Sequence, residues 1–183
     1  MKKSITPFVL LLGLAASSFA GPSTPSAETV VNDAIKQAQK GNRGVLVMFH
    51  ASWCGWCHRL DKTLEKPEVA KMLEKRFVII HIDGSERPEK ISLENAGWEK
   101  YSEKWGAKDQ GLPFLVTLDA KGEKKGDSKI PDPKTGTPAN FGFPTEPAEY
   151  ARLSEILKAA NPEFSSKEVT VLLDALKADR PKS

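Results

Sequence analysis

Cysteine is scarce in this 183-residue chain, which contains only Cys54 and Cys57. Two cysteines cannot build the network of bridges that holds small disulfide-rich secreted domains together. An excess of charge of one sign is also lacking, because 27 Lys and Arg residues against 24 Asp and Glu residues leave a formal net charge of +3. This balance gives no electrostatic reason to expect binding to nucleic acid or to an anionic membrane surface, so we expect no nucleic acid partner.

Long apolar runs are lacking as well, apart from one short segment near the N-terminus. Two lysines precede the apolar residues 8–16, and Ser18 and Ala20 are the small residues that signal peptidase requires. The segment is too short to span a bilayer as a mature helix. We therefore predict a signal peptide over residues 1–20, cleaved after Ala20, and a periplasmic or secreted mature chain.

The remaining residues are enough for one domain with a full core. Pro and Ser residues suggest a flexible leader over residues 21–27. We place the main domain at residues 28–160 and a C-terminal helical extension at residues 161–183. No internal repeat is visible, and we expect a monomer.

Hydrophobic periodicity predicts alternating helices and strands. Apolar runs of strand length occur at residues 45–49, 77–83 and 113–119, and a charged hairpin leads into a fourth strand. Helical patterns cover residues 27–40, the segments before and after Pro67, 91–105, 148–160 and 165–178. Residues 130–147 are rich in Pro and Gly and read as a long irregular loop, a kind of segment that is often functional.

Both cysteines lie in "ASWCGWCHRL" (51–60), directly after a predicted strand. A C-x-x-C pair beside a βαβ pattern is typical of a redox-active dithiol. C-x-x-C-H is also the attachment motif for c-type haem, and Cys54, Cys57 and His58 could instead bind a soft metal such as Cu(I) in a metallochaperone. The same five residues cannot serve both a dithiol and a haem.

The redox interpretation is favoured over both alternatives. Haem needs a second axial ligand, and the downstream candidates Met72 and His81 lie on an apolar helical stripe and inside a strand. A copper site would have only two thiol ligands, and the sequence contains no Met-rich segment that could supply others. A purely structural bridge is also disfavoured, because closing so short a loop removes little entropy from the unfolded chain. We therefore expect no resident metal or cofactor.

The position of each cysteine suggests its role. A helix that starts near Cys54 places this residue at the helix N-terminus, where unpaired N–H groups and the helix dipole stabilise a thiolate. Cys57 lies one turn further in and faces the core. Cys54 is thus the expected nucleophile, and Cys57 the residue that resolves the mixed disulfide.

Three segments resemble the thioredoxin-like family. "VLVMFHASWCGWCHRLDKTL" resembles its active-site segment, "GLPF" (111–114) its cis-proline loop, and "KPEVAKMLEKRFVIIHID" the helix and strand of its secreted single-domain branch. The resemblance covers residues 28–160. It implies an α/β thioredoxin fold, with a central mixed sheet of about four to five strands flanked by helices, here with an extra C-terminal helix. It also implies a thiol–disulfide oxidoreductase that exchanges electrons with protein disulfides.

The resemblance also implies a substrate-binding surface. Pro113 would be cis and face the cysteine pair, and the backbone of Leu112 would be offered to an extended substrate strand. Apart from the resemblance, we expect Trp53 and Trp56 to form an exposed apolar rim for substrate peptide, the alternative being partial burial as packing, more for Trp53 than for Trp56. We further hypothesise that "ANFGFP" (139–144) packs near the site and shapes substrate choice, although it could equally close over the sheet.

The chain departs from the family at Met48, which occupies the position of a buried Asp that helps to move the proton of the second cysteine. His58 and Asp61 are candidates for proton transfer or pKa tuning, with Asp83 and His50 as further possibilities. The direction of electron flow is not fixed by the motif. We favour a reductant, which in an oxidising compartment would need electrons from a membrane donor.

Overall fold

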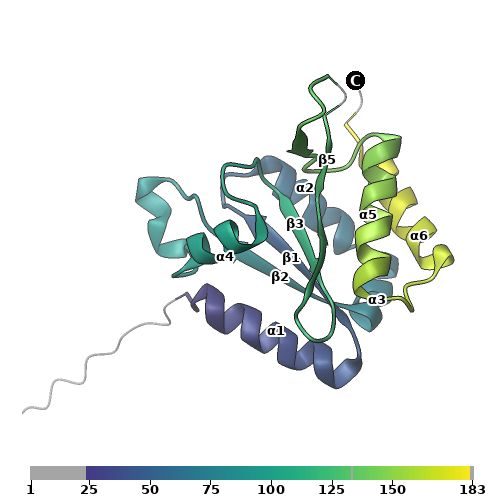
Figure 1. The fold of residues 1–183 in the computed structure, drawn as a ribbon, viewed down its shortest axis with the longest axis horizontal. Coiled ribbons are helices and arrows are strands. Elements are labelled where there is room, and N and C mark those ends of the chain that lie inside the picture. The colour runs from purple at the N-terminus through teal and green to yellow at the C-terminus, as the bar shows by residue number, and fades with distance from the viewer. Residues whose placement is uncertain (1–23, 133, 182–183) are drawn as a thin grey trace, which may run out of the picture.

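The computed structural model describes residues 24–132 and 134–181 (Figure 1). The predicted signal peptide and the first three residues of the predicted leader lie outside the described residues. Within the described ranges, every helix falls short of the length and apolar character that crossing a bilayer requires.

A four-stranded mixed sheet forms the centre of the molecule, in the order β2-β1-β3-β4. The strands are β1 (Gly44–His50), β2 (Phe77–Asp83), β3 (Phe114–Leu118) and β4 (Lys124–Asp127). β1 runs parallel to β2 and antiparallel to β3, which is antiparallel to β4. Every residue of β1 except His50 is buried, as a continuous apolar run in a central strand predicts.

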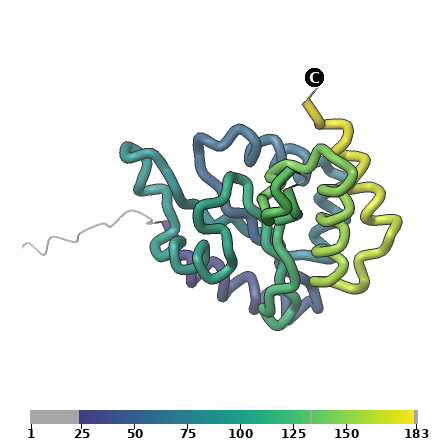
Figure 2. Tube along the Cα trace, turned by 45° about the horizontal axis from the view of Figure 1, so that its top comes forward, coloured from purple at the N-terminus to yellow at the C-terminus, as the bar shows by residue number. Residues whose placement is uncertain are grey.

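Helices cover both faces of this sheet (Figures 1 and 2). Val45, Val47 and Phe49 of β1 share one core cluster with residues of α1 (Ala27–Gly41) and α4 (Trp98–Trp105). Leu46 and Met48 of the same strand point to the other face. There they share a second cluster with α2 (Gly55–Leu64), α3 (Pro67–Arg76), α5 (Pro147–Ala160) and α6 (Ser166–Ala178).

The helix boundaries follow from local capping chemistry. Pro67 opens α3 at a position where its missing N–H costs nothing. Ser165 and Glu168 form the predicted capping box at the start of α6. The buried residues of α6, among them Leu172 and Leu176, belong to the same core cluster as α2, α3 and α5. The last helix is therefore packed on the domain.

Two predicted segments differ in the structure. The helix predicted over residues 91–105 is instead a 3₁₀ helix, η1 (Pro88–Leu93), followed by α4. Gly97, in the left-handed region at φ 79°, separates them. The buried side chain of Asn95 also bonds the backbone of Asp83 and Pro25 rather than a helix. Local side-chain bonding of this kind competes with helix formation.

The segment predicted to be an irregular loop over residues 130–147 contains a small hairpin. β5 (Lys129–Pro131) pairs antiparallel with β6 (Pro138–Asn140). The Asp132 carboxylate accepts the backbone N–H groups of Lys134 and Thr135. This turn chemistry outweighs the low strand propensity of a Pro-rich segment.

Candidate active site

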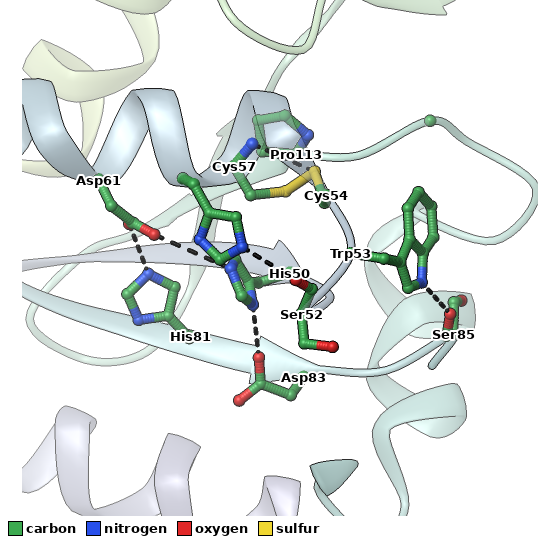
Figure 3. The surroundings of a disulfide bond; sticks show 12 residues. His50, Ser52, Trp53, Cys54, Cys57, Asp61, His81, Asp83, Ser85 and Pro113 are labelled. Carbon is green, nitrogen blue, oxygen red and sulfur yellow. Dashed lines mark hydrogen bonds and ion pairs between the residues drawn. A yellow bond between two sulfur atoms is a disulfide. The ribbon is translucent and has the colours of Figure 1, made fainter. Parts of the chain in front are cut away.

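The two cysteines form a disulfide where β1 runs into α2 (Figure 3). Cys54 is the N-cap of α2, and the backbone N–H of Cys57 donates to Cys54 Sγ at 3.1 Å. Cys57 is completely buried, whereas Cys54 keeps 3% of its surface exposed. The sequence-based placement of Cys54 at a helix N-terminus is confirmed.

The loop before β3 lies against this disulfide. The Leu112–Pro113 peptide bond is cis, as the family resemblance implied, and Pro113 lies beside the two sulfur atoms in Figure 3. Leu112 packs against the buried cluster of Ala51, Cys54 and Cys57. The structure thus brings the active-site segment and the predicted cis-proline loop together, from positions more than 50 residues apart. The substrate-binding roles of Leu112 and Pro113 stay predictions.

Two tryptophans lie exposed beside the disulfide. Trp53 and Trp56 are 47% and 46% exposed. The Trp53 indole N–H donates to the Ser85 carbonyl at 2.8 Å, which fixes the ring (Figure 3). The guanidinium of Arg59 lies 5.6 Å from the centre of the Trp56 ring. The rim is therefore exposed as expected, and its role in substrate binding stays a prediction.

The segment after β6 also reaches the site. The Asn140 amide donates to the carbonyl oxygens of Gly111, at 2.7 Å, and Pro113, at 2.9 Å. The Phe143 ring lies 5.9 Å from that of Trp56. The hypothesis that residues 139–144 pack near the site is confirmed, and their effect on substrate choice stays a prediction. Sequence reasoning did not identify Asn140, because nothing in its local pattern distinguishes it from an ordinary turn residue.

All three histidines of the chain gather next to the cysteines. The His50 ring lies 5.2 Å from that of His58 and 5.3 Å from that of His81. His50 Nδ1 bonds Asp83 Oδ1 at 2.7 Å, and His81 Nε2 bonds Asp61 Oδ1 at 2.9 Å (Figure 3). We call these five residues the histidine cluster.

Carboxylates in and near the histidine cluster raise the pKa of His81. Burial lowers the pKa of His81, but the hydrogen bond that His81 donates to Asp61 and the nearby carboxylates outweigh burial, and the pKa is raised overall. Met48, at the position of the family's buried Asp, is completely buried. The proton-transfer or tuning roles suggested for His58 and Asp61 stay predictions. Sequence reasoning placed His81 inside a strand, which is correct, and missed that it faces Asp61.

A comparison with protein-family models agrees with this geometry. The thioredoxin-like model matches residues 26–120, which is 95 of the 183 residues. The chain belongs to the thioredoxin-like family. The matched region contains Cys54, Cys57 and Pro113, so the predicted family is confirmed on the segments that carry the site.

Curated proteins similar to this thioredoxin-like chain include two named as disulfide isomerases. Protein disulfide-isomerase erp38 of Neurospora crassa is 40% identical over 62 residues, which cover 33% of this chain and 17% of that protein. Protein disulfide-isomerase tigA of Aspergillus niger is 29% identical over 157 residues, 78% of this chain and 44% of that protein. The chain thus spans less than half the length of either relative.

A solved structure supports the thioredoxin fold. A disulphide isomerase from Xylella fastidiosa Temecula1 superimposes with a TM-score of 0.50 and 18% identity, covering 90% of this chain and 100% of that one. At this identity the likeness concerns the fold alone. The predicted α/β thioredoxin fold, with a four-stranded mixed sheet between helices, is confirmed.

Proposed function

We propose that the chain is an exported thiol–disulfide oxidoreductase that reduces disulfides in protein substrates through Cys54 and Cys57. One observation carries the proposal: the two cysteines form a disulfide across the first turn of α2, with the less buried cysteine at the helix N-cap. The family and the disulfide isomerases that this chain resembles support the same chemistry.

Cys54 is the nucleophile of the proposed reaction. In the reduced chain its thiolate would be favoured by the positive end of α2 and by the N–H of Cys57, which already points at Cys54 Sγ. Cys57 is buried beneath it and cannot meet a protein substrate first. The order of attack follows from this difference in exposure.

The reaction balances in two exchange steps. Cys54 thiolate attacks one sulfur of the substrate disulfide, forming a mixed disulfide, and the second substrate sulfur leaves as a thiolate that takes up a proton. Cys57 thiolate then attacks Cys54 Sγ, and the first substrate sulfur leaves in the same way. The substrate gains two electrons and two protons, and the chain is left with the Cys54–Cys57 disulfide seen in the structure.

The surroundings of the disulfide suit a peptide substrate. Trp53 and Trp56 offer exposed apolar surface. Leu112 packs against the two cysteines, and its backbone would pair with an extended substrate segment. A cavity of about 390 Å³ continues from Leu112 between β1 and α4, lined by Phe49 and Trp98 among others. Side chains next to the substrate cysteine could lie there.

Export and the electron source complete the proposal. The lysines, the apolar segment and the small residues before Gly21 support cleavage after Ala20 and a periplasmic or secreted location. A reductant in an oxidising compartment must be reduced again, and a membrane dithiol donor is the class of partner that fits.

Trapping of mixed disulfides tests the exchange activity, and the intact mass of the protein tests whether the leader is cleaved on export. A Cys57→Ser variant expressed with its leader should accumulate mixed disulfides with exported proteins through Cys54, and its intact mass should begin at Gly21. Absence of any mixed disulfide, with equal amounts of folded protein, would argue against the exchange reaction. A retained leader in the cytoplasmic fraction would argue against export alone.

A further inference from the structure

We propose that His50, His58 and Asp61 of the histidine cluster form a binding site for a divalent transition-metal ion of the zinc class. One nitrogen or oxygen atom from each lies within 4.8 Å of the others. The three side chains come from the end of β1 and from successive turns of α2, two elements held rigidly by the core. This departs from the sequence-based expectation of no metal, which weighed the thiols and took the histidines one at a time.

Hydrogen bonds fix which nitrogen of each imidazole is free. Asp83 Oδ1 accepts from His50 Nδ1 at 2.7 Å, so a neutral His50 carries its proton there and leaves a lone pair on Nε2. The Ser52 carbonyl can only accept, so His58 Nε2 donates to it at 2.9 Å and leaves a lone pair on Nδ1. Each histidine is thereby prepared as a ligand through its second nitrogen.

The groups around these ligands have the arrangement of the outer shell of a metal site. Metal-binding histidines typically donate their other N–H to a carboxylate or a backbone carbonyl, which orients the ring. Asp83 does this for His50, and the Ser52 carbonyl for His58. The Asp61 carboxylate is itself held by His81 Nε2 at 2.9 Å and keeps Oδ2 toward His50 Nε2, at 3.9 Å. That separation is too long for a hydrogen bond.

Donor chemistry and spacing favour an ion of this class. Two imidazoles and a carboxylate suit Zn²⁺ and its first-row neighbours, and three protein ligands leave a position open to solvent. Zinc bonds of about 2.0–2.1 Å bring tetrahedral donor atoms to roughly 3.3 Å from one another. The three donor atoms lie within 4.8 Å of one another, so binding requires them to move closer, and the exposed side chain of His58 has room to move. His58 follows Cys57, so a bound ion would lie beside the redox pair.

Zinc titration of the oxidised chain tests the proposal. The protein is the untagged full chain with the disulfide intact, so neither sulfur is available as a thiolate, and ZnCl₂ binding is measured by calorimetry. We expect one ion per chain, and the same affinity in the Cys54→Ser/Cys57→Ser double variant. Cobalt(II) should give a visible spectrum without the intense ultraviolet band of thiolate ligation. No saturable binding, or binding lost with the cysteines, would overturn the site.

Single variants separate ligands from supporting residues. His58→Ala changes an exposed side chain and should weaken zinc binding at least about tenfold without loss of fold, as should Asp61→Asn. His81→Gln changes only the group that orients Asp61. It should therefore weaken zinc binding by less than His58→Ala or Asp61→Asn does. Asp33→Asn, on the exposed face of α1, is the matched control and should bind like wild type. Equal affinity in wild type, His58→Ala and Asp61→Asn, with unchanged thermal transitions, would contradict the proposal.

Discussion

The two flanks of the Cys54–Cys57 disulfide differ sharply in chemistry. We call the exposed rings of Trp53 and Trp56 the apolar flank, and the Phe143 ring lies 5.9 Å from that of Trp56. On the other flank all three histidines meet two aspartates (Figure 3). The first flank offers exposed aromatic area, with the Arg59 guanidinium over Trp56, which suits a range of peptide sequences. The second offers directed lone pairs and negative charge, which suits a cation. We propose that one redox bond borders two surfaces, one for a peptide substrate and one for a metal ion.

Removing the proposed nucleophile should have the largest effect, because the proposed exchange begins at the Cys54 sulfur. Cys54→Ser should lower the reduction of insulin disulfides by at least about a thousandfold. Ser154→Ala, on α5, serves as the control. Reductase activity in Cys54→Ser comparable with wild type would remove this residue from the mechanism. Zinc binding should survive the same substitution, which separates the two surfaces.

Truncating the apolar flank should impair the reduction of protein disulfides more than the reduction of small disulfides. Trp56→Ala should raise KM for a protein disulfide about tenfold, equivalent to roughly 1.4 kcal/mol of lost contact energy. It should leave the reduction of a small aromatic disulfide within about twofold, since the thiol chemistry is untouched. Val171→Ala, an exposed apolar residue on α6, is the control. Equal losses on both substrates would mean that Trp56 supports the site rather than the substrate.

Asn140 anchors the segment that carries Phe143 to the loop of Gly111 and Pro113, and its substitution should destabilise the fold. Asn140→Ala leaves the part-buried carbonyl of Pro113 without its donor, at a cost of about 1–3 kcal/mol, whereas the exposed carbonyl of Gly111 can bond water instead. The midpoint of thermal unfolding should fall by roughly 2–10 °C. Calorimetric scans of this variant and of Asn32→Ala, an exposed substitution on α1, provide the measurement. An unchanged midpoint for Asn140→Ala would show that the hairpin is not anchored to the loop.

The smallest effect is expected at Asp179, which ties the end of α6 to α2, the helix shared by both flanks. Hydrogen bonds from Lys66 and Thr63 lower the pKa of the Asp179 carboxyl. A lowered folded-state pKa contributes stability that is present at neutral pH and is lost as the pH falls through that pKa. Asp179→Asn should therefore cost under about 1 kcal/mol at pH 7 and show a shallower loss of stability in acid.

Denaturant midpoints measured across the acid range check this prediction. Asp174→Asn, whose exposed carboxylate lies 3.5 Å from Lys177 Nζ, is the control. An acid profile of Asp179→Asn that parallels wild type would contradict the assigned role.

Much of the fold could be predicted because its signals are local. The buried strands are continuous apolar runs, Pro67 separates α2 from α3, and Ser165 with Glu168 caps α6. The redox pair was predictable from the C-x-x-C spacing, and the cis proline from the family resemblance. Each of these depends on residues close together in the sequence, or on a motif that keeps its spacing.

The missed features depend on tertiary placement. The histidine cluster arises because β1 and β2 pair in a register that sets His50 opposite Asp83, while α2 carries Asp61 over His81. No periodicity within one segment encodes that register. The same holds for Asn140, whose partners Gly111 and Pro113 lie 29 and 27 residues away. The break at Gly97 was missed because the flanking residues keep a helical pattern.

The reduction potential of the Cys54–Cys57 pair tests the central claim most directly. Equilibration of the purified chain with glutathione buffers, read by thiol alkylation, gives this value. A reductant predicts a reversible transition near about −270 mV, the range of thioredoxin. A transition near about −120 mV would reveal a disulfide-forming oxidant, and a bond that no glutathione or dithiothreitol buffer opens would contradict thiol–disulfide exchange altogether.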